Sequence, residues 1–347
     1  MIFFDVTKTG AATHRSGLTR VSTRLRESLG AEATGMAWEA ATRHFAAPAH
    51  GPARPGDWWL TSELFSEEER PGVTAFLQGR SGGRAAIFHD AIPLKHPHIT
   101  WPHSVARHPG YMKLLAGFDR VWAVSRASRD ELMGFWRWQG VTCPPPVEVL
   151  SLGADFDGTP RRTVPPAATD VPRLLCLGII EPRKNQPFLL EICEELWREG
   201  LAFELHLVGR VNPHFGRPIV ARIEKLRRTR RAVLYFHAAV DDATVAQLFA
   251  TARATVFPTL AEGCGLPLLE SLWRGVPCVC SDLPVLRENA DGGGCLPVAL
   301  HDSAAWKDAL RRIIRDDALH RRLGAEATSR PLPAWADAAR SLAQALR

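Results

Sequence analysis

Two glutamates flank a short glycine-containing turn in the segment AEGCGLPLLESLWRGVP, residues 261–277. Gly263 and Gly265 allow positive φ and close backbone approach, and the proline that follows suits the first turn of a helix. The segment therefore predicts a loop that leads into an open helix N-terminus, where N–H groups and the helix dipole can bind an anion such as a phosphate. Glu262 and Glu270 would repel that anion, so we interpret them as acceptors for hydroxyl groups on either side of it. A sugar, a diphosphate and a ribose in a row make a nucleotide sugar.

A second polar loop, LGIIEPRKNQPFLLE, follows the predicted strand RLLCLG and contains Arg183 and Lys184. In open α/β sheets, ligands bind beyond the carboxyl ends of the strands, which is where both loops are expected. Together they offer two cations and a helix N-terminus, which would hold a diphosphate and stabilise it as a leaving group. Each of these residues also has an interpretation without a ligand. Arg183 and Lys184 could lie in a solvated turn, Glu262 could be exposed to solvent, and Glu270 could complement the helix dipole. These alternatives leave the two glycines of the turn unexplained.

The first half of the chain predicts an alternation of strands and helices. It opens with the apolar run IFFDV at 2–6, followed by SGLTRVSTRLRESLG, in which apolar residues recur at helical spacing. Further short apolar runs are AAIF at 85–88, RVWAV at 120–124 and VEVL at 147–150. Alternation of this kind favours a parallel sheet covered by helices.

The segment DGTPRRTVPPAATDVP, residues 157–172, is dense in Pro, Thr and Asp and predicts a linker between two domains. The alternation of strands and helices begins again after it. We therefore expect one doubly wound α/β domain over 1–156 and a second over 173–330. Residues 331–347 predict a C-terminal helix that could pack back on the first domain or on the second.

Size and composition agree with a two-domain globular protein of 347 residues. No run of eighteen apolar residues and no signal-peptide pattern is present, so we expect a cytoplasmic protein. The seven cysteines include no CxxC pair and are interpreted as reduced, mostly buried thiols. A net charge of +6 permits an anionic partner, which could be a nucleotide, a phospholipid headgroup or a nucleic acid.

At this point the sequence resembles glycosyltransferase family 4. The resemblance rests on the two glutamates of EGCGLPLLE, on LGIIEPRKN, and on DDATVAQLFATARATVFPTLAEG, with shorter matches at FHDAIPL and AVSRASRDEL. It covers the second domain nearly continuously and the first in patches. It implies the GT-B fold, in which two Rossmann-like domains face a central cleft, and a retaining transfer from a nucleotide-diphosphate sugar. The EPRKN and FHDAIPL pieces are similar to bacterial mannosyl- and rhamnosyltransferases of surface polysaccharide and lipopolysaccharide synthesis.

The resemblance implies a role for each matching residue of the second domain. Glu262 would hold hydroxyl groups of the donor sugar and act in catalysis, and Glu270 would hold the ribose. Arg183 and Lys184 would hold the diphosphate, assisted by backbone N–H groups of the glycine loop. That loop consists of Gly263, Cys264, Gly265 and Leu266.

Two residues of the first domain also match the family. His89, in FHD, corresponds to the histidine that reaches the donor sugar across the cleft, and its alternative is a histidine that caps a strand end. Gly17, in HRSGLTR, corresponds to the glycine-bearing loop that approaches the phosphates. The chain departs from the family in lacking a tandem glycine in that loop, in Ile179 where many members carry arginine, and in Cys264 where an aromatic residue is usual. We expect Cys264 to reshape the sugar pocket.

No residue matches a catalytic nucleophile, so we expect the leaving oxygen of the diphosphate to act as the base while the protein orients the substrates and stabilises charge. No cofactor and no metal are expected, because relatives of this kind typically need no metal. His96, His98 and His103 in HPHITWPH are separated by prolines that rule out regular helical ligand spacing.

The sequence thus favours a retaining, metal-independent hexosyltransferase that moves a mannose- or rhamnose-like sugar to a glycan or lipid-linked glycan. One alternative is a dehydrogenase, but GCGLPL lacks the third glycine of GxGxxG. Another is a non-catalytic α/β protein that binds nucleotides or anionic surfaces. Arginines spread over both halves argue against a nucleic-acid partner. The basic segment 221–231 is typical of a solvated helix face but could contact anionic lipid of the inner membrane.

Overall fold

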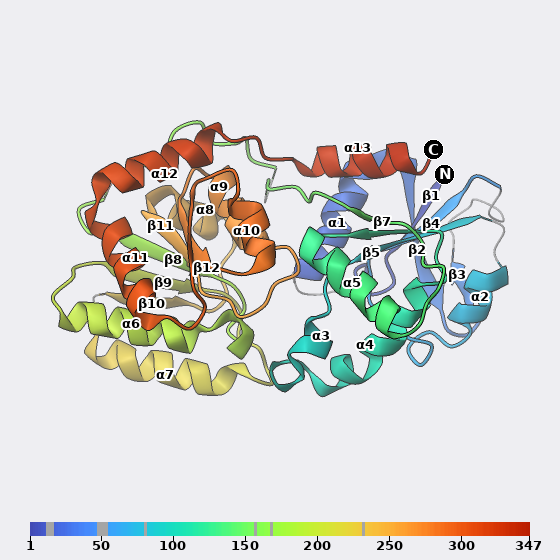
Figure 1. Cartoon of the computed structure of the whole chain (residues 1–347), viewed down its shortest axis with the longest axis horizontal. Helices are drawn as coiled ribbons and strands as arrows, with labels where there is room; N and C mark the ends of the chain where they lie inside the picture. Colours follow the sequence, from blue (N-terminus) through green and yellow to red (C-terminus); the bar gives the residue numbers. More distant parts are fainter. Residues whose placement is uncertain (12–16, 47–54, 80–81, 156–157, 167–168, 231–232) are drawn as a thin grey trace. The chain divides into compact units, whose positions relative to one another are not determined.

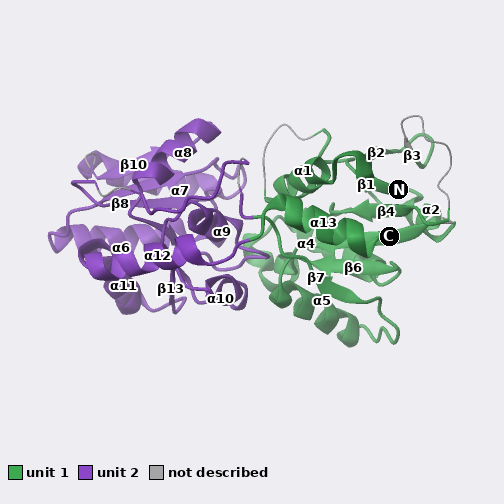
Figure 2. Ribbon diagram, turned by 90° about the horizontal axis from the view of Figure 1, so that it is seen from above, with its two compact units in different colours: residues 1–153, 333–347 green, residues 154–332 purple. Residues whose placement is uncertain are grey.

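The computed structural model describes residues 1–11, 17–46, 55–79, 82–155, 158–166, 169–230 and 233–347 (Figure 1). The chain divides into two compact units, which are coloured separately in Figure 2. Unit 1 comprises Met1–Gly153 and Pro333–Arg347, and unit 2 comprises Ala154–Leu332. Each unit is a sheet covered by helices, as the alternating sequence pattern predicts.

Unit 1 is built on a seven-stranded sheet in the order β3-β2-β1-β4-β5-β6-β7, in which all described pairs except β2 with β3 are parallel. The strands are β1 (Ile2–Asp5), β2 (Ala33–Glu39), β3 (His44–Ala46), β4 (Trp58–Thr61), β5 (Gly83–Phe88), β6 (Arg120–Ala123) and β7 (Val147–Val149). The helices are α1 (Gly17–Leu29), α2 (Val73–Gly79), α3 (Ile92–Lys95), α4 (Pro102–Leu115), α5 (Arg126–Trp138) and α13 (Trp335–Ala345). The four predicted strands correspond to β1, β5, β6 and β7, whereas β2, β3 and β4 have no counterpart in the prediction.

The core of unit 1 explains why its central strands read as continuous apolar runs. Every residue of β1 is buried, because helices cover both faces of a parallel sheet. Large side chains fill the space between the sheet and its helices, among them Phe4, Trp59 and Trp136. Leu25 of α1 is fully buried, in agreement with the helical spacing of apolar residues in that segment.

Unit 2 has a six-stranded parallel sheet in the order β10-β9-β8-β11-β12-β13. The strands are β8 (Arg173–Leu177), β9 (Glu204–Val208), β10 (Leu234–His237), β11 (Ala254–Phe257), β12 (Cys278–Ser281) and β13 (Cys295–Val298). The helices are α6 (Gln186–Arg198), α7 (Gly216–Thr229), α8 (Asp242–Thr251), α9 (Leu266–Trp273), α10 (Pro284–Ala290), α11 (Ser303–Arg315) and α12 (Asp317–Ser329). Its main core contains Leu205, Leu207, Val256 and Trp306, all fully or almost fully buried.

The strand order creates a topological switch point in each unit. In unit 2 the order reverses between β8 and β11, and in unit 1 it reverses between β1 and β4. Loops that leave neighbouring strands in opposite directions open a crevice at such a point, and ligands of doubly wound sheets bind there. The two polar loops of the sequence analysis follow β8 and β11, so they flank the switch point of unit 2.

The segment predicted as a linker lies against unit 2 where the structure describes it. Trp273 donates its indole N–H to the carbonyl of Thr159 over 3.0 Å, and Arg161 donates to the carbonyl of Ala327 over 2.8 Å. The C-terminal helix α13 instead packs against α1 within unit 1 (Figure 1). Trp335 of α13 is buried there, and a Cβ atom at Gly153 would lie 2.3 Å from its backbone nitrogen, so this contact requires glycine.

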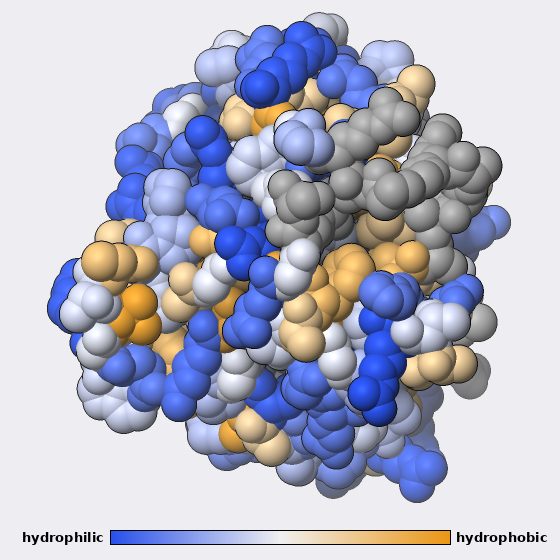
Figure 3. All heavy atoms as spheres, turned by 90° about the vertical axis from the view of Figure 1, so that its right-hand side faces the viewer, coloured by the Kyte–Doolittle hydropathy of each residue, from blue (hydrophilic) through white to orange (hydrophobic). Residues whose placement is uncertain are grey.

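The surface is ordinary for a globular protein in the view of Figure 3, where hydrophobic residues are interspersed among hydrophilic ones. Trp138, at the end of α5, is 77% exposed. No helix in the described ranges has the length and apolar character needed to cross a membrane.

Candidate functional site

The loops that follow β8 and β11 are joined to each other at the switch point of unit 2. The backbone N–H of Leu260 donates to the carbonyl of Arg183 over 2.8 Å, and the hydroxyl oxygen of Thr259 lies 3.1 Å from the same carbonyl. Asn185 adopts a left-handed conformation with φ 56° and ends the first loop, after which α6 begins. These contacts bring Arg183 and Lys184 to the loop that carries Glu262.

Glu262 is the centre of a buried ion cluster. Its Oε1 accepts hydrogen bonds from Lys184 Nζ, from Arg183 Nη1 at 3.1 Å and from Thr259 Oγ1 at 2.8 Å. The side chains of Glu262 and Lys184 are each 9% exposed, so the structural alternative of a solvent-exposed Glu262 does not hold. The Oε2 atom accepts no hydrogen bond from any described residue, which leaves it available to a hydroxyl group.

Burial and neighbouring charges act on the pKa values of Glu262 and Lys184 in opposite directions. Burial by itself would raise the pKa of Glu262, but the charges of Lys184 and Arg183 outweigh burial and hold that pKa below its usual value. Burial lowers the pKa of Lys184, and Glu262 offsets part of that effect. Lys184 also lies over the ring of Phe257, with Nζ 4.9 Å from the ring centroid.

Arg183 connects the two loops through its guanidinium group. Its Nη2 lies 2.9 Å from Glu181, its Nη1 donates to the carbonyl of Ala261 over 2.9 Å, and the same nitrogen reaches Glu262. Asn212 in turn donates to the other oxygen of Glu181 over 2.9 Å. Arg183 is therefore fixed by contacts within the protein and does not lie in a solvated turn. Lys184 makes fewer such contacts.

The glycine loop forms an open helix N-terminus, as predicted. Gly265 has φ 82° and ψ 42° and directly precedes α9, whose first turn contains a proline. The N–H groups of Cys264, Gly265 and Leu266 donate to no acceptor in the described part of the chain. Of the two glycines that allow positive φ, Gly265 adopts it and Gly263 does not. An N-terminus of this kind suits an anion.

Glu270 and Cys264 complete the predicted residues of unit 2. Glu270 lies one turn into α9 and is 4% exposed, so it is not a solvated complement to the helix dipole in the first turn. Cys264 is half-buried, and burial together with the charges of Glu262, Glu288 and Glu270 raises its pKa to about 12. The thiol is thus protonated near pH 7.

The predicted residues of unit 1 lie at the carboxyl end of its sheet. His89 follows β5, and its Nε2 lies 2.8 Å from the carbonyl of Ser62; a carbonyl only accepts, so Nε2 carries the proton and Nδ1 can accept. Burial lowers the pKa of His89, which keeps the ring neutral near pH 7. Gly17 is the first residue of α1, while residues 12–16 of its loop lie outside the described residues.

Sequence reasoning missed a buried ion cluster at the switch point of unit 1. Arg70 donates to Asp5 over 2.6 Å and to Glu63, and all three side chains are almost fully buried. Glu63 also accepts the backbone N–H groups of Lys8 and Thr9, each over 2.8 Å, and so fixes the loop after β1. The one available signal was Asp5, a charge within the otherwise apolar run IFFDV.

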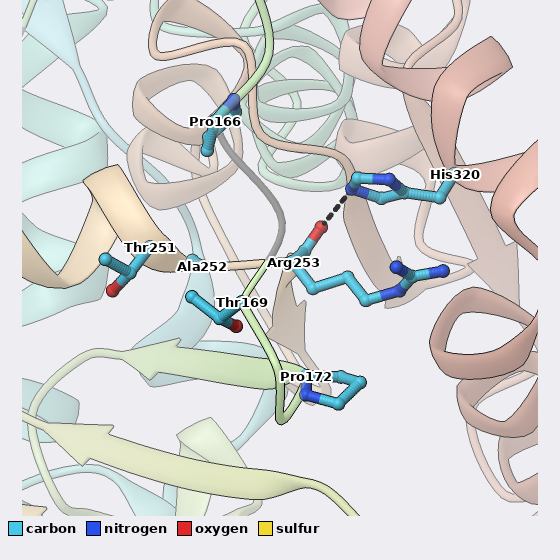
Figure 4. A pocket seen from close by; sticks show the side chains of 7 residues that line it. All are labelled: Pro166, Thr169, Pro172, Thr251, Ala252, Arg253 and His320. Atoms are coloured by element: carbon cyan, nitrogen blue, oxygen red, sulfur yellow. Dashed lines mark hydrogen bonds between the residues drawn. The ribbon is translucent and has the colours of Figure 1, made fainter.

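A small recess at the opposite end of the unit 2 sheet is shown in Figure 4. It encloses about 10 Å³, which is room for about one water molecule. His320 closes it by a 2.9 Å hydrogen bond to the carbonyl of Arg253, beside the amino ends of β8 and β11. Its lining residues are Pro166, Thr169, Pro172, Thr251, Ala252, Arg253 and His320. The recess is too small for a substrate and lies away from the polar loops.

Comparison with known structures identifies the fold. Sucrose-phosphate synthase from Thermosynechococcus elongatus matches 99% of this chain and 97% of its own with a TM-score of 0.75 at 18% identity. Anabaena HepE, solved with UDP and glucose, matches 99% of this chain and 98% of its own with a TM-score of 0.71 at 14% identity. WaaG, described as a glycosyltransferase involved in lipopolysaccharide biosynthesis, gives a TM-score of 0.66 at 14% identity over 100% of this chain and 99% of its own. The fold is GT-B, with two Rossmann-like units, as the sequence predicts.

Sequence comparison shows what the chain is similar to. Residues 171–316 match the family described as glycosyl transferases group 1. The serotype-specific mannosyltransferase WbdA of Escherichia coli is 31% identical over 251 residues, which are 67% of this chain and 29% of that protein. The O-antigen chain mannosyltransferase B of Escherichia coli is 34% identical over 121 residues, 35% of this chain and 31% of that protein. The chain therefore spans less than a third of the length of these two relatives.

Proposed function

We propose that the chain is a glycosyltransferase that binds a nucleotide-diphosphate sugar in unit 2 and passes its hexose to a glycan acceptor. One observation carries the proposal: Arg183, Lys184 and Glu262 meet at the switch point of unit 2, in loops that also supply the open N-terminus of α9. Cations and free N–H groups suit a diphosphate. The free Oε2 of Glu262 suits a sugar hydroxyl.

The proposed donor carries mannose or a similar hexose such as rhamnose, because the relatives reported above are named mannosyltransferases. Thermal-shift screening against GDP-, UDP- and dTDP-sugars identifies the nucleotide, since a ligand that binds only the folded state raises the melting temperature. Transfer of labelled sugar from the selected donor to mannose-terminated or lipid-linked oligosaccharides then tests catalysis. Binding without transfer to any acceptor, and without donor hydrolysis, would favour the alternative of a non-catalytic nucleotide-binding protein.

The proposed transfer retains anomeric configuration and uses neither metal nor cofactor. In the described ranges no group of three or more His, Cys, Asp or Glu residues could hold a metal ion, and Arg183 and Lys184 can take the charge of the diphosphate. We expect turnover to persist in excess EDTA and the first product detected by NMR to have the configuration of the donor. Activity lost in EDTA and restored by Mg²⁺ or Mn²⁺ would contradict metal independence, and an inverted product would contradict retention.

The proposed acceptor includes lipid-linked glycans, so contact with an anionic membrane surface is part of the proposal. Arg217, Lys225 and Arg228 are exposed on α7, and Glu224 is the single acidic residue of that helix. Basic side chains near an anionic surface contribute roughly 1 kcal/mol each. Sedimentation with phosphatidylglycerol vesicles should therefore weaken when these three residues are replaced by glutamine, while sedimentation with neutral vesicles should be absent in both proteins. Equal binding of both proteins to the anionic vesicles would remove α7 from the contact.

A further inference from the structure

Asn289, in the last turn of α10, holds the backbone of the glycine loop. Its side-chain amide Nδ2 donates to the carbonyl oxygen of Cys264 over 2.5 Å. The two helices α9 and α10 that flank this contact are neighbours in the fold (Figure 1). Asn289 was not among the residues predicted from the sequence, and it belongs to neither of the two polar loops.

This hydrogen bond fixes the direction of the next backbone N–H group. In a trans peptide the carbonyl and the N–H point in opposite directions. Because the carbonyl of Cys264 points at α10, the N–H of Gly265 points away from α10. That N–H donates to no acceptor within the described residues, and it lies at the open N-terminus of α9, where an anion is favoured.

The same side of the loop is closed to a ligand by packing. A Cβ atom at Gly265 would lie 2.5 Å from Leu286 Cδ2 and 3.4 Å from Asn289 Nδ2, both on α10. The C-terminal end of α10 is fixed in turn by Arg330, whose Nη1 donates to the carbonyls of Asn289 at 2.7 Å and Gly293 at 2.9 Å. A phosphate can therefore approach the Gly265 N–H only from the face opposite α10.

We propose that Asn289 is a positioning residue that holds the Cys264–Gly265 peptide in the orientation that presents the Gly265 N–H to a phosphate of the nucleotide donor. Asn289 does not touch the donor itself; it acts through the carbonyl of Cys264. The inference rests on the proposed nucleotide-sugar function and adds to it a residue that controls diphosphate affinity. Without the Asn289 amide, no hydrogen bond fixes the Cys264–Gly265 peptide, and the Gly265 N–H loses its orientation toward the phosphate.

The test separates the diphosphate from the rest of the nucleotide. Asn289→Leu keeps the size of the side chain and removes the amide. We expect it to raise the Kd for the nucleoside diphosphate about tenfold, the loss typical of one hydrogen bond to a charged group, and to leave the Kd for the corresponding free nucleoside unchanged. Calorimetry measures the Kd for the nucleoside diphosphate, and NMR titration measures the Kd for the free nucleoside. Asn289→Gln keeps an amide donor and should lose less diphosphate affinity than Asn289→Leu.

Arg287→Gln, on the exposed face of the same helix, is the matched control and should change neither constant. Equal losses of nucleoside and diphosphate affinity in Asn289→Leu, or equal losses in Asn289→Leu and Asn289→Gln, would overturn the positioning role, because either result describes general damage to the loop. Unchanged diphosphate affinity in a folded Asn289→Leu protein would overturn it too. If the unsubstituted protein binds no nucleoside diphosphate at all, the proposed function itself fails.

Discussion

Glu262 pairs with both cations that are expected to meet the diphosphate, so its replacement changes the charge at the site. Glu262→Gln removes that negative charge. We expect free nucleoside diphosphate to bind roughly threefold more tightly, because Arg183 and Lys184 then attract it without competition. Turnover should fall sharply, because the carboxylate no longer orients the hydroxyl groups of the sugar in the transition state.

Glu270→Gln is the matched variant for this prediction. It should weaken free nucleotide and intact donor alike, by about 1.5–3 kcal/mol, because the proposed ribose is common to both ligands. Calorimetry with nucleotide and with donor, beside steady-state kinetics, measures the difference between the two variants. The division of roles is wrong if a folded Glu262→Gln protein loses free-nucleotide affinity as strongly as Glu270→Gln does.

At the scale of the element, the start of α9 depends on one backbone conformation. Gly265→Ala places a Cβ atom at φ 82° and 2.5 Å from Leu286, so either the loop or α10 must move. We expect the free energy of unfolding to fall by about 1–3 kcal/mol and nucleoside diphosphate binding to weaken. Denaturant unfolding and calorimetry measure the two effects.

Gly134→Ala is the control for that substitution. Gly134 lies inside α5, and a Cβ atom there would contact nothing within 4 Å. Alanine should therefore stabilise the protein by roughly 0.5–1 kcal/mol without affecting nucleotide binding. Equal effects of the two substitutions would show that the positive φ of Gly265 has no special importance.

The edge of the unit 2 sheet contains a pair of histidines that makes stability depend on pH. His206 of β9 lies with Nδ1 3.2 Å from His237 Nε2 of β10, and its other nitrogen is 3.1 Å from Glu204. Burial lowers the pKa of His206. For His237, burial and then the charges of His206 and Arg227 lower the pKa. The folded state therefore takes up protons less readily than the unfolded state, whose histidines titrate near 6.5.

Stability from this pair should be complete above about pH 6.5 and should be lost as the pH falls below that value. Replacing both His206 and His237 by phenylalanine removes the titrating groups and keeps aromatic packing. We expect the free energy of unfolding of this double variant to fall less between pH 7 and pH 5.5 than that of the unsubstituted protein. Parallel pH profiles from urea unfolding would exclude the pair as a source of the pH dependence.

At the scale of the whole molecule, the proposed ribose contact, Glu270, belongs to unit 2, whereas the loop that contains Gly17 and is expected to approach the phosphates belongs to unit 1. Arg70→Met leaves Asp5 and Glu63 of unit 1 buried without their cation, which typically costs about 3–5 kcal/mol. We expect unit 1 to lose stability, the loop after β1 to lose its position and turnover to fall. The affinity for the free nucleoside should stay unchanged, because Glu270, its proposed ribose contact, lies in unit 2.

Hydrogen exchange resolves the two units and is the measurement for this prediction. Amides of unit 1 should exchange faster in Arg70→Met, while amides of β8 and β11 keep their protection. Arg120→Gln breaks an exposed ion pair with Glu148 in the same unit and should change stability by less than about 1 kcal/mol. Loss of free-nucleoside affinity in Arg70→Met would contradict the assignment of the ribose contact to unit 2.

The sequence by itself determined the features that depend on local pattern. Alternating apolar runs and helical spacing predicted two doubly wound domains, and the glycine turn before an apolar helix predicted an open N-terminus at Gly265. The strand of residues 2–6 and its counterparts could be found because buried parallel strands are continuously apolar. Strands β2, β3 and β4 of unit 1 escaped prediction, because β3 and β4 are only three and four residues long and β2 mixes glycine, alanine and polar residues without a distinct period.

Only the tertiary structure decided which charges meet. Arg183 and Lys184 are 79 and 78 residues from Glu262 in the chain, and pairing of β8 with β11 brings them together. The same holds for Asp5 with Arg70 and for Asn289 with the carbonyl of Cys264. A local pattern reports which residues can form an element, whereas contacts between loops depend on strand order, and strand order is fixed by packing between segments distant in sequence.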